Sequence, residues 1–238
     1  MQVVILAGGL GTRLGPLTAN LPKALVPVNG KPFLAHVLEL LKENGLDRIL
    51  ILHGHQGRQL ETAFADGSAF AVHLAWREDG PRLLGTGGAL RAALDLLEPE
   101  FLVLYGDTYL DIDYQAVVRA FRAGGKPALM TVLHNRGRWD KSNVVFREGR
   151  LLRYEKGNPD PAMDYIDYGL AALRREVIEE LPAGQPSDLA GLYSRLVREG
   201  RMAGFEVFQR FYEIGTSQGL AETEKYLASR PPTRSGAP

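Results

Sequence analysis

Short apolar runs alternate with helical patterns through the first half of the chain, and this alternation limits the fold more than any other sequence feature. Four apolar runs have the length of buried strands: 3–7, 48–52, 71–76 and 101–105. Three intervening segments carry apolar residues at helical spacing: 32–43, 56–65 and 87–97. This order predicts an α/β fold with a mainly parallel mixed sheet and helices on both faces. Ligands of such sheets bind at the carboxyl ends of the strands.

The second half of the chain has a different pattern. Beyond about residue 126, four strand-like runs follow one another over shorter connections: 127–134, 143–147, 151–154 and 165–173. A last helix is expected at about 217–228. We therefore expect a single domain over 1–229 with two halves, about 1–125 and about 126–229. The segment 230–238 is rich in Pro, Gly and Ser, and we expect it to be a disordered tail.

Charge and composition exclude several classes of function. Lys plus Arg and Asp plus Glu number 28 each, so no net charge attracts the chain to nucleic acid or to an anionic membrane. The absence of cysteine excludes disulfides, thiolate zinc sites and a cysteine nucleophile. No run approaches the roughly 18 apolar residues that span a bilayer, and the first apolar run is too short for a signal peptide. We expect a cytoplasmic protein that binds neither nucleic acid nor membrane; its oligomeric state, a homo-oligomer included, stays open.

The loop after the first strand is rich in glycine. Gly8, Gly9 and Gly11 allow the backbone to approach a ligand and to turn successive amides inward as an anion-binding nest. Arg13 adds a planar cation that suits phosphate oxygens. The spacing fits neither a Walker A loop nor a dinucleotide-binding fingerprint, which needs a third glycine where Leu14 stands. Taken alone, this loop is equally explained by a tight turn with an exposed arginine.

A lysine follows between two prolines. Pro22 and Pro27 exclude a long helix and stiffen the segment around Lys23. A lysine held in this way beside a glycine nest is placed to contact a phosphate, although a solvated surface lysine is the commoner case.

Together the two segments resemble the paired signature of the sugar-phosphate nucleotidyltransferases, also called nucleotide-sugar pyrophosphorylases. The matching residues are Gly8-Gly9-x-Gly11-Thr12-Arg13-Leu14 and Pro22-Lys23-Ala24-Leu25-x-Pro27-Val28. The resemblance implies an enzyme that joins a nucleoside triphosphate to a sugar 1-phosphate by in-line attack on the α-phosphate, releasing pyrophosphate, with Mg²⁺ as cofactor. It also implies a Rossmann-like fold of the nucleotidyltransferase and GT-A type, with nucleotide bound by the first half and sugar phosphate by the second.

The resemblance also implies roles for individual residues. The catalytic residues would be Arg13, Lys23 and Asp107. The nucleotide-binding set would be Leu6, Ala7, Gly8, Gly9, Gly11, Thr12, Arg13, Gly85 and Thr86. The sugar-phosphate-binding set would be Glu155, Lys156, Asp167 and Gly169. The metal ligands would be Asp107 and Glu213.

Residue chemistry supports two of these sites independently. Asp107 follows an apolar strand, and a carboxylate at a strand's carboxyl end is a natural ligand for a hard cation. Gly85 and Thr86 open a helix, where backbone amides are free to meet a polar ligand, although Gly-Thr is also an ordinary helix cap.

Two positions depart from the family pattern. Asp167 stands where asparagine is typical, and an aspartate only accepts hydrogen bonds at neutral pH, so the sugar hydroxyls that it recognises would differ. Glu213 stands where the second metal-binding aspartate is typical, and it adds one methylene. Pairing of Glu213 with Arg210 stays open as an alternative.

Among subfamilies, the segments 32–34, 84–89 and 107–113 are most similar to heptose 1-phosphate guanylyltransferases, which favours GTP with a heptose or hexose 1-phosphate. Two alternatives remain. A GT-A-like glycosyltransferase would use Asp111 and Asp113 as its Asp-x-Asp metal motif, but it needs no triphosphate nest. A regulatory subunit that binds a nucleotide sugar without turnover would not need the complete set of Arg13, Lys23, Asp107 and Lys156.

Overall fold

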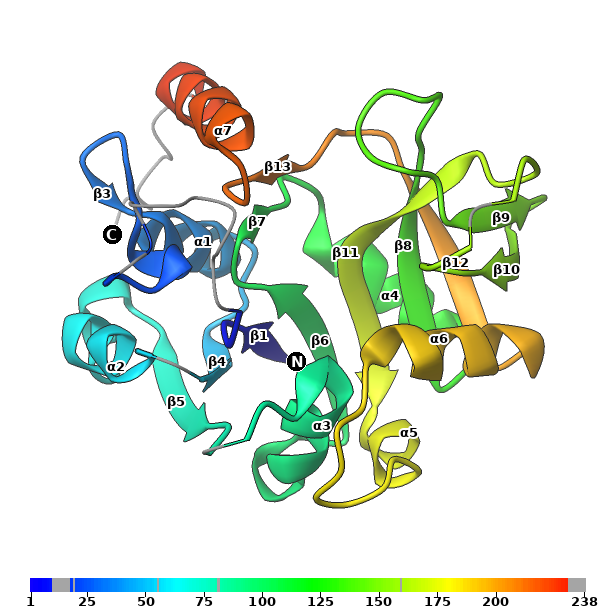
Figure 1. Cartoon of the computed structure of the whole chain (residues 1–238), viewed down its shortest axis with the longest axis horizontal. Helices are drawn as coiled ribbons and strands as arrows, with labels where there is room; N and C mark the ends of the chain where they lie inside the picture. Colours follow the sequence, from blue (N-terminus) through cyan, green and yellow to red (C-terminus); the bar gives the residue numbers. More distant parts are fainter. Residues whose placement is uncertain (10–17, 19, 55, 81, 159, 231–238) are drawn as a thin grey trace.

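A nine-stranded mixed sheet runs through the molecule, which is described here by a computed structural model covering residues 1–9, 18, 20–54, 56–80, 82–158 and 160–230. The strands are β1 (Gln2–Leu6), β4 (Arg48–His53), β5 (His73–Glu78), β6 (Glu100–Tyr105), β8 (Ala128–His134), β9 (Val144–Arg147), β10 (Arg150–Tyr154), β11 (Tyr165–Arg174) and β12 (Met202–Val207). They lie in the order β10-β9-β11-β6-β1-β4-β5, with β8 paired to both β11 and β12 (Figure 1).

The sheet combines a parallel part, formed by β5, β4, β1 and β6, with antiparallel pairs on the far side of β6. β1 pairs in parallel with β4 and β6, and β4 pairs in parallel with β5. β11 runs antiparallel to β6 and to β8. Every residue of β1 from Val3 to Ile5 is fully buried, and the side chains alternate between the two faces of the sheet. The prediction of a mainly parallel mixed sheet covered on both faces is confirmed.

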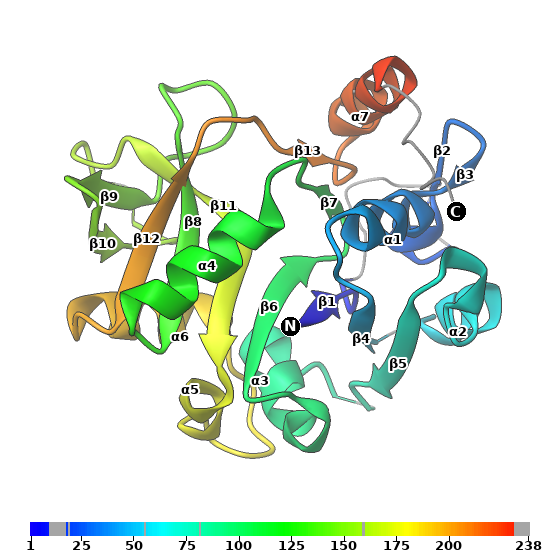
Figure 2. The ribbon, with the colours of Figure 1, turned by 180° about the vertical axis from the view of Figure 1, so that it is seen from behind.

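The helices divide between the two faces. They are α1 (Phe33–Glu43), α2 (Arg58–Phe64), α3 (Gly85–Ala92), α4 (Tyr114–Gly124), α5 (Arg175–Glu179), α6 (Leu189–Arg198) and α7 (Ser217–Ser229), with 3₁₀ turns at Lys23–Leu25, Ser68–Phe70 and Leu94–Leu96. Helices α3, α5 and α6 cover the face seen in Figure 1, and α1 and α4 cover the face seen in Figure 2. The buried side chains accordingly form two hydrophobic clusters, one on each side of the sheet.

Two small strand pairs lie outside the main sheet. β2 (Pro27–Val28) pairs with β3 (Lys31–Pro32), and β7 (Thr108–Tyr109) pairs with β13 (Tyr212–Glu213). The second pair joins the loop after β6 to the segment before α7, two parts of the chain that are far apart in sequence. It is this pair that brings the C-terminal part of the chain to the strand ends.

The structure corrects the sequence analysis in several places. Helices α4 and α6 and strand β12 were not predicted, and the helix expected at 87–97 begins at Gly85 and ends at Ala92. Arg230, expected in a disordered tail, forms ion pairs with Asp111 and Glu43; residues 231–238 lie outside the described residues. Among the helices that the structure describes, none has the length and apolar character to cross a membrane.

Candidate active site

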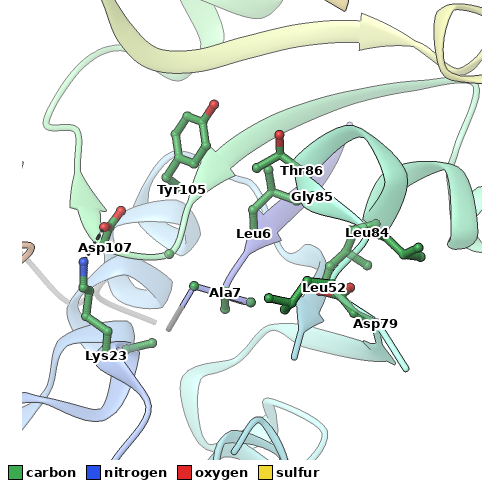
Figure 3. A pocket seen from close by; sticks show the side chains of 16 residues that line it. Leu6, Ala7, Lys23, Leu52, Asp79, Leu84, Gly85, Thr86, Tyr105 and Asp107 are labelled. Atoms are coloured by element: carbon green, nitrogen blue, oxygen red, sulfur yellow. Dashed lines mark hydrogen bonds and ion pairs between the residues drawn. The ribbon is translucent and has the colours of Figure 1, made fainter. Parts of the chain in front are cut away.

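Two cavities meet where β6 ends. The first, of about 350 Å³, lies between the ends of β1 and β6 and the start of α3 (Figure 3). The second, of about 610 Å³, lies over β11 and beside β13. Tyr105 and Asp107 line both cavities. A ligand in one cavity is therefore a neighbour of a ligand in the other.

The parallel pairing of β1 with β6 sets up this junction. Leu6 lies opposite Tyr105, so the loops that follow the two strands leave the sheet side by side. The amide of Gly106 donates to the carbonyl of Leu6 at 2.9 Å. A Cβ on Gly106 would lie 3.1 Å from that oxygen and 3.2 Å from Ala7, so a larger residue here would press the two loops apart by a few tenths of an ångström. This is the edge of the sheet at which the strand-end rule predicts a ligand.

Most of the predicted nucleotide-binding set lines the first cavity. The lining residues in that set are Leu6, Ala7, Gly8, Gly9, Gly85 and Thr86, and Lys23 joins them. Gly11, Thr12 and Arg13 lie outside the described residues. The structure therefore places both flanks of the glycine loop at the cavity.

An ion pair links the two predicted catalytic residues in this region. Lys23 begins a 3₁₀ turn directly after Pro22, whose extended backbone directs the chain into the site. Lys23 Nζ lies 2.9 Å from Asp107 Oδ2 (Figure 3), and only 14% of the lysine side chain is exposed. Thr108 Oγ1 donates to the other oxygen of Asp107 at 3.3 Å. The predicted catalytic lysine, Lys23, is thus held against the predicted metal ligand, Asp107.

The start of α3 is less free than the sequence predicts. The amides of Gly87 and Gly88 both donate to the carbonyl of Ser187, at 2.9 and 3.1 Å. The hydroxyl of Thr86 accepts from the amide of Leu189 at 2.9 Å and so helps to cap α6. A distant segment of the same chain therefore occupies two of the amides at this helix start, while Gly85 and Thr86, the predicted contacts, line the first cavity.

A carboxyl group that was not predicted also lines the first cavity. Asp79 follows β5, and its Oδ1 is buried with no hydrogen-bond partner among the described residues. A Cβ on Gly8 would lie 2.7 Å from Asp79 Oδ2, so a larger residue at this position would force the carboxyl group to move. Burial raises the pKa of Asp79 to about 6, and the nearby His53 opposes this shift. Since Asp79 also follows a parallel strand, the argument that selected Asp107 would have found it.

Lys156, Asp167 and Gly169 of the predicted sugar-phosphate set line the second cavity. Asp167 Oδ1 accepts from the amide of Gly169 at 3.0 Å, and the Asp167 amide donates to Asn143 Oδ1 at 2.8 Å. Burial raises the pKa of Asp167, and the Gly169 amide, the charge of Lys156 and a hydrogen bond with Tyr154 oppose that shift. Lys156 is exposed and forms no ion pair with the acidic residues that the structure describes.

Glu155, the fourth member of that set, has a different position. It follows β10, and its amide donates to the carbonyl of Asn143 at 2.9 Å. The residues that line the second cavity include its neighbour Lys156 but not Glu155.

Arg210 lines the second cavity and does not pair with Glu213. Its guanidinium lies 4.0 Å from the centre of the Trp139 ring and 4.5 Å from that of Tyr212, and it pairs with Glu222 at 2.6 Å. The alternative in which Glu213 forms a surface pair with Arg210 is therefore wrong.

Glu213 lies on β13, next to the Asp107 segment. The amide of Ile214 donates to the carbonyl of Asp107 at 3.0 Å, and both carboxylates line the second cavity. The Glu213 carboxylate accepts from the hydroxyl of Thr216 at 3.0 Å and from the amide of Gly215. Backbone pairing thus holds two carboxylates from distant parts of the chain in one site.

These two carboxylates suit a hard divalent cation. Carboxylate oxygens are hard ligands, and Mg²⁺ is usually held by one or two carboxylates with waters and substrate phosphates. Among the described residues there is no cluster of three or more His, Asp or Glu side chains that could hold an ion entirely by itself. The donor set therefore fits Mg²⁺ shared with a phosphate substrate better than a closed protein site.

The two aspartates of the proposed Asp-x-Asp motif form structural contacts outside the two cavities. Asp111 pairs with Arg230 at 3.0 Å and accepts from the hydroxyl of Tyr226 at 2.5 Å, and Arg230 also pairs with Glu43. Asp113 accepts from the Ala116 amide at 2.9 Å and caps α4. These contacts leave the glycosyltransferase alternative without its metal motif.

Comparison with known proteins identifies the family of the chain. The family model described as "Nucleotidyl transferase" matches residues 2–229. A UTP–glucose-1-phosphate uridylyltransferase of Synechocystis is 32% identical over 84% of this chain, which spans 56% of that relative's length. An N-acetylmuramate alpha-1-phosphate uridylyltransferase of Neisseria meningitidis is 31% identical, over 94% of this chain and 97% of the relative.

Two further matches bear on the subfamily and on the fold. A D-glycero-alpha-D-manno-heptose 1-phosphate guanylyltransferase of Campylobacter jejuni is 38% identical over 48% of this chain and 50% of its own length. A solved Bacillus anthracis structure, assigned as a glucose-1-phosphate thymidylyltransferase, superposes with a TM-score of 0.85 over 97% of both chains at 20% identity, which supports the fold alone. The chain thus belongs to the nucleotidyl transferase family, and the resemblance to sugar-phosphate nucleotidyltransferases is confirmed.

Proposed function

We propose that this chain transfers a nucleotidyl group from a nucleoside triphosphate to a sugar 1-phosphate, with the nucleotide in the first cavity and the sugar phosphate in the second. The observation that carries this proposal is the junction at Tyr105 and Asp107, which line both cavities. Two anionic substrates bound side by side need positioning and charge neutralisation more than they need a covalent intermediate.

In the proposed reaction, an oxygen of the sugar phosphate attacks the α-phosphorus of the nucleotide. The new P–O bond forms as the bond between the α-phosphorus and the bridging oxygen breaks, and pyrophosphate leaves. Lys23 stabilises charge at the α-phosphate, and Lys156 holds the attacking phosphate. Arg13, outside the described residues, is proposed to contact the leaving pyrophosphate. Each of these side chains would contribute a positive charge where negative charge develops in the transition state.

Asp107 and Glu213 are the residues that we propose hold Mg²⁺. When bound, the ion supplies neutralisation of the phosphate charge. Lys23 pairs with Asp107 at 2.9 Å, and because its ammonium group has three N–H donors it can also contact a phosphate. We infer that Lys23 and Asp107 neutralise each other's charge until the substrates bind.

The sugar remains to be identified by experiment. Asp167 and Gly169 line the second cavity and are proposed to contact sugar hydroxyls, with Glu155 as a further candidate. The resemblance to heptose enzymes favours a heptose or hexose 1-phosphate. We place this chemistry in one domain whose halves, about 1–125 and 126–229, each supply one cavity, and the protein in the cytoplasm.

The test is a screen of pyrophosphate release with Mg²⁺, using four nucleoside triphosphates against hexose and heptose 1-phosphates. We expect one pair to give pyrophosphate and a nucleotide sugar in equal amounts. Transfer of sugar from a preformed nucleotide sugar, without pyrophosphate exchange on any pair, would contradict the proposal.

A further inference from the structure

The first cavity has a charged end and an apolar end. Lys23 and Asp107 lie at one end, and Leu52, Leu84 and Asp79 lie at the other (Figure 3). If the proposed function holds, the phosphates occupy the charged end, where the second cavity joins. The base must then lie at the apolar end, because the phosphates fill the charged end of the cavity.

Asp79 is the charged side chain at that apolar end. One of its oxygens is buried and has no hydrogen-bond donor among the described residues. His53, whose charge acts on Asp79, is fully buried and already pairs through Nε2 with Glu61 at 2.6 Å. A buried acceptor without a donor is costly, and a ligand that brings donors removes that cost.

Two glycines, Gly8 and Gly54, lie beside the carboxyl group of Asp79. A Cβ on Gly8 would lie 2.7 Å from Asp79 Oδ2, and a Cβ on Gly54 would lie 3.6 Å from it. The amide of Asp79 donates to the carbonyl of His53 at 2.8 Å, which extends the pairing of β4 with β5. The backbone is therefore held, while the terminal torsion of an aspartate is broad and allows the carboxyl group to turn toward a ligand.

We propose that Asp79 is the residue that determines base specificity, and that it selects guanine by accepting hydrogen bonds from N1–H and the 2-amino group. An ionised carboxylate only accepts hydrogen bonds. Guanine alone among the common bases presents two adjacent donors on its pairing edge. Adenine and cytosine place an acceptor beside their amino group, and uracil and thymine flank their one N–H with carbonyl oxygens, which a carboxylate repels.

The sharpest test exchanges guanine for xanthine, in which a carbonyl replaces the 2-amino group. Asp79→Asn presents one acceptor and one donor, which match N1–H and the 2-carbonyl of xanthine. We expect the wild type to prefer GTP to XTP in kcat/KM, and the variant to lower that preference by about 10- to 100-fold, the scale of one hydrogen bond to a charged group. A general disturbance of the site would weaken both nucleotides alike and leave their ratio unchanged.

Glu78→Gln is the matched control. It makes the same chemical change one residue earlier, on a side chain that is half exposed and lies 3.6 Å from Arg58. We expect the GTP to XTP ratio of this variant to equal that of the wild type. A second comparison needs no variant: the wild type should use ITP, which lacks the 2-amino group, about 10-fold less well than GTP.

Each outcome separates this inference from the proposed function. A wild type that makes nucleotide sugar but prefers UTP, CTP, dTTP or ATP, or that does not distinguish GTP from ITP, overturns the role of Asp79 and leaves the reaction intact. An unchanged GTP to XTP ratio in Asp79→Asn, or an equal change in Glu78→Gln, does the same. The absence of pyrophosphate release with any triphosphate would instead remove the proposed function.

Discussion

Gly219 lies in the first turn of α7 and presses against Glu213, so substituting it tests the arrangement of the proposed metal site. A Cβ at this position would lie 2.1 Å from Glu213 Oε1 and 2.6 Å from the Glu213 carbonyl oxygen. The first contact involves a movable side-chain end, but the second involves backbone, so Gly219→Ala must shift the start of α7 or β13. Overpacking of this kind costs about 1–3 kcal/mol, which for a chain of this size lowers Tm by roughly 2–12 °C.

We expect a larger effect on the reaction than on stability. A displacement of a catalytic group by about 1 Å can lower a rate about 10²-fold, and the Mg²⁺ concentration at half-maximal rate should rise because Glu213 moves. The assay is pyrophosphate release over a Mg²⁺ titration, with thermal unfolding of the same samples.

Gly191→Ala is the control, because nothing lies within 4 Å of a Cβ at this position in α6. It should keep the wild-type rate and gain up to about 1 kcal/mol of stability, since alanine favours a helix over glycine. A Gly219→Ala protein with wild-type Tm, rate and Mg²⁺ midpoint would refute the proposed position of Glu213.

Other perturbations address the remaining residues. Lys23→Ala should lower kcat by about 10²- to 10³-fold, the effect of losing one preorganised donor, as measured under saturating substrates; near-normal kcat would remove Lys23 from the site. Lys156→Ala should raise KM for the sugar phosphate far more than KM for the nucleotide, and equal effects in steady-state kinetics would contradict its proposed partner. Asp107→Asn and Glu213→Gln should each abolish most turnover, whereas Glu213→Asp should retain more because it keeps the charge; a wild-type Mg²⁺ midpoint in Glu213→Gln would show that Glu213 is not a ligand. Because burial raises the pKa of Asp79 from 3.8 to about 6, the folded state favours its protonated form, so wild-type stability should fall as pH rises from about 4 to 6 relative to Asp79→Asn; parallel curves from denaturant unfolding over this range would contradict the shift.

The parts of the site that could be predicted are those set by short stretches of sequence. Lys23 and Asp107 were predicted from a proline-bounded lysine and from a carboxylate after an apolar strand, and the parallel pairing of β1 with β6 brings their segments to one edge. Local spacing is sufficient to predict these residues, because the carboxyl ends of neighbouring parallel strands lie at the same edge of the sheet whatever sequence connects the strands.

The parts that could not be predicted depend on contacts between distant segments. The Ser187 carbonyl occupies the Gly87 and Gly88 amides although it comes from the far side of the sequence. Helices α4 and α6 were not predicted, although each begins with an aspartate cap, Asp113 and Asp188. An aspartate cap before an amphipathic run is a signal that was available in the sequence.

The pairing of β7 with β13 has a consequence for the order in which the protein acquires activity during its synthesis. The first cavity is built from residues up to Asp107 that leave the ribosome early, whereas Glu213 and the Arg230 contact with Asp111 come from its last described segments. A nascent chain can therefore contain every residue that lines the first cavity well before it holds both carboxylates of the proposed metal site, although the Ser187 carbonyl that holds the start of α3 also comes later. Domains that fold from the N-terminus as they are made can pass through such a stage, in which this protein would bind a nucleotide without transferring it.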